Sequence, residues 1–371
     1  MTSEGTAEAV PSHVFLSCLG SGIYQMAYLQ TLLSIEFPIV QAPMAGVQGS
    51  ALAVAVSNAG GLGSLPCAVF SLDAMRDELA AIRAQTTKPF NVNFFCHAPP
   101  IPDADREAAW RTALSPYYRE FGLDISVVPA GPGRAPFGHD AAQALQEIKP
   151  AVVSFHFGLP SAELLARVRA WGSKIVSSAT TVEEARWLES HGVDAIIAQG
   201  LEAGGHRGMF LSEDLGRQMG TFALVPQIVS AVRTPVIAAG GIADAKGVAA
   251  ALALGAAGAQ IGTAFLLCPE ATTSAVHRAA LKGETARQTA LTNLFTGRPA
   301  RGIVNRLMKE LGPISAAAPD FPLAAAALAP LRAEAERRGS GDFSPLWSGQ
   351  NPSGCRQIPA AQLTRELAGE H

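Results

Sequence analysis

The sequence has few charged, aromatic and cysteine residues. Charged residues make up 16% of the 371 positions and aromatic residues 6%. The 28 basic and 31 acidic side chains give a net charge of −3. A balance so close to neutrality excludes a strong electrostatic surface for nucleic acid or an anionic membrane. Five widely spaced cysteines without a CxxC pair indicate neither a disulfide framework nor a zinc site, so we expect reduced thiols and no metal.

Long hydrophobic runs are also absent. Every apolar stretch is interrupted by a charge or a glycine before the ~18 residues that a membrane span needs. The short apolar stretch 14–19 follows Glu4 and Glu8 and has no basic segment before it, which argues against a signal peptide. We therefore expect a cytoplasmic protein without a membrane partner, and we assign residues 1–30 to an N-terminal extension.

Glycine and proline, by contrast, are frequent and separate eight short apolar runs. Helical patterns follow several of these runs, at 72–86, 161–171, 181–191 and 246–254. Eight strands alternating with helices are typical of a TIM (β/α)8 barrel, and a doubly wound open sheet is the alternative. The runs lie at 38–42, 61–65, 90–94, 152–157, 174–178, 194–199, 235–239 and 258–262.

The same pattern divides the chain into parts. We predict a barrel over 31–268, with an inserted loop or extra helices between strands three and four. After Cys268 the strand pattern stops, so we expect a smaller helical cap domain over 269–339. The segment 340–371 is expected to return to the barrel.

Glycines follow the last two predicted strands, where barrels commonly bind phosphate. Gly240 and Gly241 come after the seventh strand, and Gly262 and Thr263 after the eighth. Without a Cβ the backbone can approach an anion closely, and free N–H groups can donate to it. Paired glycines can also simply turn the chain, but their presence after both strands favours a phosphate site.

A histidine framed by glycines follows the sixth strand, in the run GLEAGGHRG. Gly204 and Gly205 let the backbone approach a flat ligand, and His206 can project into the cavity as a base or hydrogen-bond donor. A structural, capping histidine is the alternative. For His97, His139, His156, His191 and His277 we prefer the structural interpretation, least firmly for His156 because it ends the fourth strand.

Several motifs in fixed order resemble the nitronate monooxygenase family, formerly called 2-nitropropane dioxygenases. They are PIVQAPMAGV, PFNVNFF, VVSFHFGLP, AQGLEAGGHRG, PVIAAGGI and QIGTAFL, while FTGRPARGIVNR and FSPLWSGQ are similar to its class I branch. The resemblance covers roughly residues 30–365. It implies an FMN-dependent barrel enzyme that oxidises alkyl nitronates such as propionate 3-nitronate, a metabolic poison, with O2 to nitrite and a carbonyl compound.

The resemblance also implies roles for individual residues. His206 matches the family's catalytic histidine, and Arg298 or Arg301 could orient a substrate carboxylate or merely stabilise a turn. Residues 269–371 contain no tyrosine, whereas some family members line the substrate pocket with cap tyrosines. The residues expected at the FMN are Ala42, Pro43, Met44, Asn93, Gln199, Gly204, Gly205, Gly240, Gly241, Gln260, Ile261, Gly262, Thr263, Trp347, Gly349 and Gln350.

Two other functions remain open at this stage. One is an FMN-dependent enoyl-acyl carrier protein reductase that uses NAD(P)H, and the other is a non-catalytic flavin-binding redox protein. For the enzyme we expect a nitronate and O2 as small-molecule partners, no nucleic acid, and a monomer or homodimer.

Overall fold

Eight short strands form a closed parallel barrel. The computed structural model describes residues 26–128 and 134–370, and its strands follow the order β1-β9-β8-β6-β5-β4-β3-β2. Hydrogen bonds of 2.9 Å from Gln41 N to Leu62 O and from Leu62 N to Ile39 O close β1 against the start of β2. The strands are β1 Ile39–Gln41, β2 Gly63–Pro66, β3 Phe90–Phe95, β4 Val152–His156, β5 Lys174–Ala179, β6 Ala195–Gln199, β8 Val236–Ala239 and β9 Gly258–Ile261. The predicted TIM barrel is confirmed.

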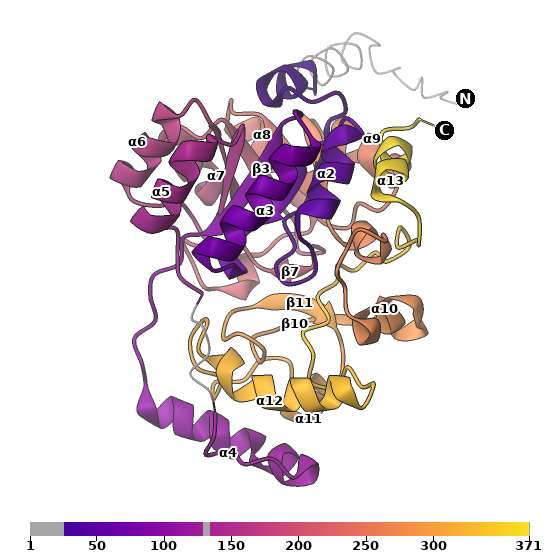
Figure 1. Cartoon of the computed structure of the whole chain (residues 1–371). Helices are drawn as coiled ribbons and strands as arrows, with labels where there is room; N and C mark the ends of the chain where they lie inside the picture. Colours follow the sequence, from indigo (N-terminus) through magenta and orange to yellow (C-terminus); the bar gives the residue numbers. More distant parts are fainter. Residues whose placement is uncertain (1–25, 129–133, 371) are drawn as a thin grey trace, which may run out of the picture.

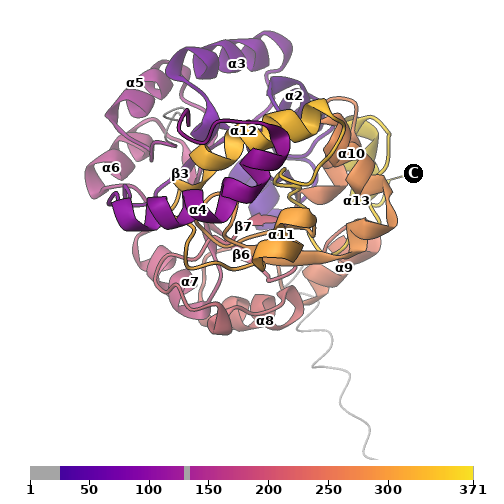
Figure 2. The ribbon, with the colours of Figure 1, turned by 90° about the horizontal axis from the view of Figure 1, so that it is seen from below.

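A ring of helices covers the outside of the barrel (Figure 2). Side-chain caps fix where several begin: Ser71 accepts from Ala74 N at the start of α3, and Thr181 from Glu184 N at the start of α7. No helix in the described ranges has the length and apolar character needed to span a membrane. The helices of the ring are α2 Ser50–Asn58, α3 Leu72–Gln85, α5 His139–Ile148, α6 Ala162–Ala170, α7 Val182–Ser190, α8 Thr221–Ala231 and α9 Ala245–Ala253.

Alternation along the strands decides which side chains enter the barrel. In β4, Val153 and Phe155 pack outward in the same core as the helices, whereas Val152 joins the apolar cluster inside the barrel. The period of two therefore turns His156 inward at the carboxyl end of the strand. In β6 the same alternation turns Gln199 inward, so both residues face the cavity at this end.

The opposite end of the barrel is closed by a helix over residues 26–33. Leu29 and Leu33 are buried at 0% and 2% exposure and pack against Val152, Ile197 and Ile237 from the barrel interior. This helix lies at the far end of the molecule from the cap (Figure 1). The predicted N-terminal extension over 1–30 was too long at its C-terminal end. Residues 26–30 are helical, and Leu29 is buried against the barrel. Residues 1–25, including Cys18 and the apolar stretch 14–19, lie outside the described residues.

The cap covers the carboxyl ends of the strands and is built from two distant segments (Figure 1). Helix α4 Ala104–Phe121 comes from the insertion after β3 and packs against α12 Ala324–Arg337. Trp110 Nε1 and Tyr118 Oη donate to carbonyls of α12 at 3.1 and 2.7 Å. Helices α10 Ala275–Lys282 and α11 Arg306–Leu311 complete the helical part.

The cap also contains strands, so the expectation that strands end at Cys268 was wrong. Strands β10 Thr289–Thr292 and β11 Ala300–Ile303 form an antiparallel pair. β11 also pairs with β7 Gly205–His206, which is part of the loop after β6. The glycine-framed loop is therefore the third strand of the cap sheet.

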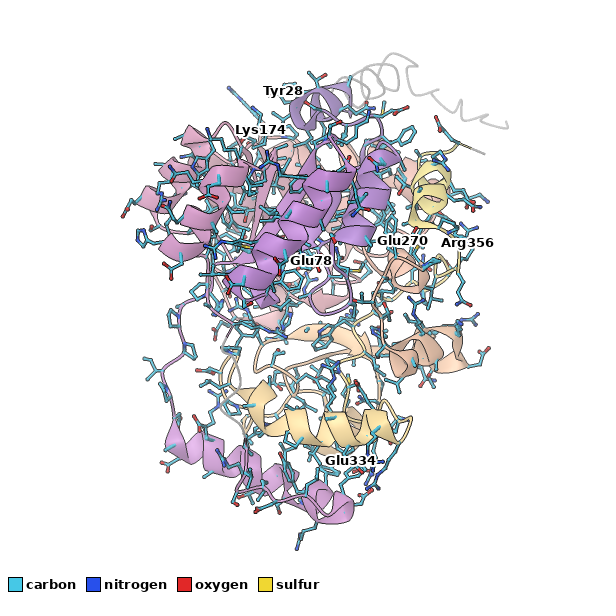
Figure 3. All side chains as sticks on the ribbon, viewed as in Figure 1. Tyr28, Glu78, Lys174, Glu270, Glu334 and Arg356 are labelled. Carbon is cyan, nitrogen blue, oxygen red and sulfur yellow. The ribbon has the colours of Figure 1, made fainter. Side chains whose placement is uncertain are left out.

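The C-terminal segment runs from the cap back to the barrel (Figure 3). Helix α13 Ala360–Leu367 packs beside α2 and α9. The carboxylate of Glu270 accepts a hydrogen bond of 3.1 Å from Ala360 N at the start of α13. Arg356 pairs with Glu366 on the same side of the molecule.

The buried helix 26–33 predicts a stability test at one pair of neighbouring residues. Leu29→Ala removes a fully buried side chain from the closed end of the barrel, so we expect the free energy of unfolding to fall by about 2–5 kcal/mol. Tyr28→Ala is the matched control, because Tyr28 is 47% exposed (Figure 3) and should change stability by about 0.5 kcal/mol or less. Urea denaturation measures both. Equal stability of the Leu29 variant and the parent would contradict this packing.

Candidate active site

A cavity lies at the carboxyl ends of the barrel strands, between the barrel and the cap. Most residues expected from the sequence lie in its wall, although they come from separate loops. These residues are Ala42, Pro43, Met44, Asn93, Gln199, Gly204, Gly205, His206, Gly240, Gly241, Gln260, Gly262, Thr263, Trp347 and Gly349.

Two expected residues lie elsewhere. Ile261 packs outward against Leu52, Val56 and Leu363 because side chains alternate along β9. Gln350 is exposed, and its backbone N donates to Glu202 O at 3.0 Å. Gln350 thus helps to hold the loop after β6 without facing the cavity.

The side chain of Gln199 fixes the loop that carries His206. Its Nε2 donates to His206 O at 2.9 Å, and its Oε1 accepts from Gly208 N at 2.7 Å. His156 Nε2 also lies 3.2 Å from His206 O, and His156 Nδ1 lies 3.0 Å from Ser178 Oγ. Both polar ends of the Gln199 amide therefore bind protein backbone.

The cap fixes His206 from the other side. His206 pairs with Ala300 of β11, and its Nε2 lies 2.9 Å from Thr296 Oγ1. The rings of Phe321 and Trp347 lie at centroid distances of 5.3 and 5.5 Å from the imidazole. The ring is held at one nitrogen, and Nδ1 makes no hydrogen bond in the described part of the chain.

The returning segment 343–351 connects three loops of the barrel. Gly349 N donates to Thr263 Oγ1 at 2.9 Å, and Asn351 Nδ2 donates to Gly241 O at 2.9 Å. Gly204 must be glycine here, because a Cβ would lie 2.5 Å from Gly349 N. The loops after β6, β8 and β9 are thus held together by the chain that leaves the cap.

The loops after β8 and β9 have the properties of an anion site. Gly241 has φ of +72°, a left-handed conformation that favours glycine. A Cβ on Gly262 would lie 3.4 Å from Ala42 Cβ and 3.7 Å from Met44 Sδ, which is ordinary van der Waals contact, so a larger side chain is needed to fill this space. The N–H groups of Gly241 and Gly262 find no acceptor among the described residues. They remain available to a phosphate.

Comparison with known proteins identifies the family. The sequence model described as nitronate monooxygenase matches residues 27–370. A nitronate monooxygenase of Pseudomonas aeruginosa is 45% identical over 342 residues, which are 91% of this chain and 97% of the relative. The chain belongs to the nitronate monooxygenase family. Its relatives are flavin-dependent oxidoreductases, so the protein is an enzyme.

Solved structures agree with this membership. The nitroalkane oxidase from Streptomyces ansochromogenes has a TM-score of 0.82 and 40% identity, covering 92% of this chain and 97% of that one. FabK from Thermotoga maritima is less similar, with a TM-score of 0.67 and 28% identity, covering 92% of this chain and 94% of that one.

Burial keeps the histidines around the cavity of this nitronate monooxygenase family member neutral. Desolvation lowers the pKa of His97, His156 and His277 to about 4. It also lowers the pKa of His206 well below its usual range, and the nearby positive charge of Arg134 acts in the same direction. At neutral pH the imidazole of His206 carries no charge.

Neither arginine proposed for a substrate carboxylate lines the cavity. Arg301 Nε donates to Leu201 O at 2.9 Å, and its Nη1 donates to Thr289 Oγ1 at 3.2 Å. Arg298 lies over the ring of Phe157, with Cζ 4.1 Å from the centroid, and donates to Met209 O. Both side chains join the cap to the loop after β6, which agrees with the structural alternative.

The sequence did not single out several residues of the cavity wall. Phe95 ends β3 and could have been chosen from its register, whereas His156 and His277 were given a structural interpretation. His277 and Asn351 belong to segments near the expected site, and Arg134 lies in the insertion. Arg207, next to His206, does not line the cavity: it is fully buried and donates to Gly200 O and Gln199 O at 2.7 Å each.

No group of three or more possible metal ligands occurs among the described residues.

The buried histidines predict a pH-dependent stability. The pKa of His97, His156 and His277 is about 4 in the folded protein and about 6.5 in the unfolded chain. Their contribution to the free energy of unfolding is therefore complete above pH 6.5 and is lost as the pH falls toward 4. Each histidine adds a slope of about 1.4 kcal/mol per pH unit in this window. We expect His277→Gln to lower the slope of the unfolding free energy against pH by about 1.4 kcal/mol per pH unit. Urea denaturation at several pH values measures this slope.

The exposed His139 provides the control for this measurement. Its side chain is 64% exposed, so His139→Gln controls for the loss of a histidine at the surface. A parental slope in the His277 variant would show that His277 does not stay neutral in the folded protein.

Proposed function

We propose that the protein oxidises alkyl nitronates with O2 to a carbonyl compound and nitrite, and that its flavin is FMN. The observation that carries the proposal is a single cavity whose wall contains both His206 and the glycines that follow β8 and β9. The family membership supports this reaction, since the Pseudomonas aeruginosa relative is named a nitronate monooxygenase.

The cavity residues fit a flavin with a single phosphate. Gly241 and Gly262 would hold the phosphate through backbone N–H groups, at the place where barrels commonly bind this group. Gln260 Oε1 is buried without a hydrogen-bond partner in the described chain, and an N–H donor on the edge of a flavin ring would satisfy it. The wall thus offers donors for the phosphate and an acceptor for the ring.

The segment after Trp347 favours FMN over a larger dinucleotide. Cys355 Sγ donates to Thr263 O at 3.1 Å, and a Cβ on Gly354 would lie 2.2 Å from Ala243 O. This segment packs closely against the loops after β8 and β9, beside the glycines proposed to hold the phosphate. This packing supports a flavin that ends in a single phosphate.

When bound, the flavin accepts electrons from the substrate and reacts with O2, while the protein orients the reactants. A nitronate carries its negative charge on the nitro oxygens, and a neutral His206 can donate one hydrogen bond to it. An imidazole with a strongly lowered pKa is a weak base, so removal of an α-proton from a neutral nitroalkane is disfavoured. The site therefore suits substrates that arrive already deprotonated.

Oxygen uptake and nitrite release with a panel of alkyl nitronates test the reaction. Turnover well above that of free flavin is expected, and its absence would exclude the proposal. Anaerobic addition of NADH should leave the flavin oxidised. Rapid bleaching, followed by reduction of an enoyl thioester, would instead indicate the enoyl reductase.

Gly262→Leu tests the phosphate site. The leucine side chain would occupy the space beside Ala42 and Met44, so we expect folded protein that has lost most of its flavin. Gly283→Leu is the matched control, because Gly283 is exposed with φ of −83° and lies outside the cavity. Flavin absorbance and circular dichroism measure both variants. Full flavin occupancy after Gly262→Leu would refute the phosphate assignment.

His206→Asn tests the hydrogen bond to the nitronate. Loss of a hydrogen bond to a charged group costs about 1.5–3 kcal/mol, so kcat/KM for nitronates should fall roughly 10- to 100-fold. Flavin content should stay near that of the parent, because other loops form the phosphate site. Thr296→Val removes only the partner of Nε2 and should have a smaller effect. If the His206 variant turned over nitronates at the parental rate, His206 would have a structural role and no catalytic one.

A further inference from the structure

Arg134 is a half-buried cation in the wall of the active-site cavity and has no carboxylate partner among the described residues. It lines both this cavity and a second cavity between the barrel and the cap. Its Nη1 is buried and has no hydrogen-bond partner, and no acidic group of the described chain forms a salt bridge with it. A guanidinium left in this state is costly unless a ligand supplies an anion.

The surroundings of Arg134 leave its charge uncompensated. No aspartate or glutamate lines the active-site cavity within the described residues. Glu107 and Asp140 line the second cavity, but neither forms a salt bridge with Arg134. The histidines nearby are neutral, since burial lowers the pKa of His97 to about 4 and that of His206 further below its usual range. The cavity therefore combines one free positive charge with a hydrogen-bonding imidazole.

The other arginines near the site do not line the cavity, and each donates at least one hydrogen bond to the protein, although Arg298 Nε has no partner in the described chain. Arg207 and Arg301 donate to backbone carbonyls of the loop around β6, and Arg298 stacks on Phe157. Arg134 is thus the arginine of the described cavity wall with a donor left for a ligand.

The position of Arg134 separates it from the expected phosphate. It follows β3, whereas the glycine site follows β8 and β9, and the strand order puts these on opposite sides of the barrel. The ring of Phe321 contacts both Arg134 and His206, with its centroid 5.7 Å from Arg134 Cζ and 5.3 Å from the His206 centroid. Arg134 and His206 thus share one aromatic neighbour as well as one cavity wall.

We propose that Arg134 binds a carboxylate at the end of the substrate remote from the nitronate group. This inference rests on the proposed function and assigns to it a residue that determines specificity for short nitronates with a second, terminal acidic group. Arginine suits this role because its planar guanidinium can donate two parallel hydrogen bonds to one carboxylate. Specificity is thereby assigned to a residue of the insertion after β3, while residues 269–371 supply no tyrosine to the cavity.

A matched pair of substrates isolates the contribution of the carboxylate. Propionate 3-nitronate and propyl-1-nitronate share the reacting group and the three-carbon length, but only the first has a carboxylate. Arg134→Gln should lower kcat/KM for propionate 3-nitronate by about 10- to 100-fold, mainly through KM, and should lower that for propyl-1-nitronate much less. Arg134→Lys keeps the positive charge without the bidentate geometry. It should therefore retain part of the preference for propionate 3-nitronate over propyl-1-nitronate.

Arg111→Gln is the control variant. Arg111 lines the second cavity but not the active-site cavity, so its removal should leave the preference at the parental value. An equal loss on both substrates after Arg134→Gln, an unchanged preference, or the same loss after Arg111→Gln would each overturn the proposal. Flavin content measured on every variant ensures that the comparison concerns loaded enzyme.

A binding measurement separates this inference from the reaction itself. 3-Nitropropionate and 1-nitropropane differ by the same carboxylate, and calorimetric titration into the flavin-loaded enzyme requires no turnover. The parent should bind 3-nitropropionate more tightly, and Arg134→Gln should abolish the difference. If the parent oxidises no nitronate yet shows this Arg134-dependent binding, the proposed function fails and the carboxylate site stands. If it oxidises nitronates while binding is independent of Arg134, the carboxylate site alone fails.

Discussion

The pairing of Gly205 and His206 with β11 is the contact on which the site depends. A loop at the end of a barrel strand is ordinarily mobile, but this one is held on three sides. Gln199 binds its backbone from the barrel, β11 pairs with it from the cap, and Gly349 packs against Gly204 from the returning segment. The imidazole of His206 is consequently positioned by backbone contacts from regions far apart in the sequence, which is the kind of rigid support that a reacting site requires.

Burial without acidic partners gives the site its electrostatic character. Arginines and histidines crowd the region between barrel and cap, yet the nearby carboxylates are engaged elsewhere. Glu184 accepts from Phe210 N and Thr180 N, and Glu202 accepts from Thr221 N. The histidines respond by losing their protons, whereas arginine stays charged even when its pKa is lowered. The protein thus retains positive charge in the cavity through arginine and hydrogen-bonding capacity through histidine.

The barrel could be predicted from the sequence because its signals are local. Each strand is a short apolar run ended by glycine or a polar residue, and alternation within the run explains why Gln199 and His156 face inward while Ile261 faces outward. The cap strands were missed for the opposite reason. β10 and β11 have four residues each, TALT and ARGI, without a clear alternation of apolar and polar side chains. Their pairing with β7 is a long-range contact, and no short segment of the sequence indicates it.

The place of Arg134 shows most clearly what local patterns cannot supply. In the sequence it belongs to a run rich in glycine and proline that is typical of a surface loop. The insertion, however, sends α4 into the cap, where Trp110 and Tyr118 bind α12, before the chain returns to the barrel at α5. Arg134 lies between α4 and α5 in the sequence, and it lines both the active-site cavity and the second cavity. An insertion that looks dispensable in the sequence therefore provides the free cation of the cavity, and its length is set by the path from barrel to cap and back.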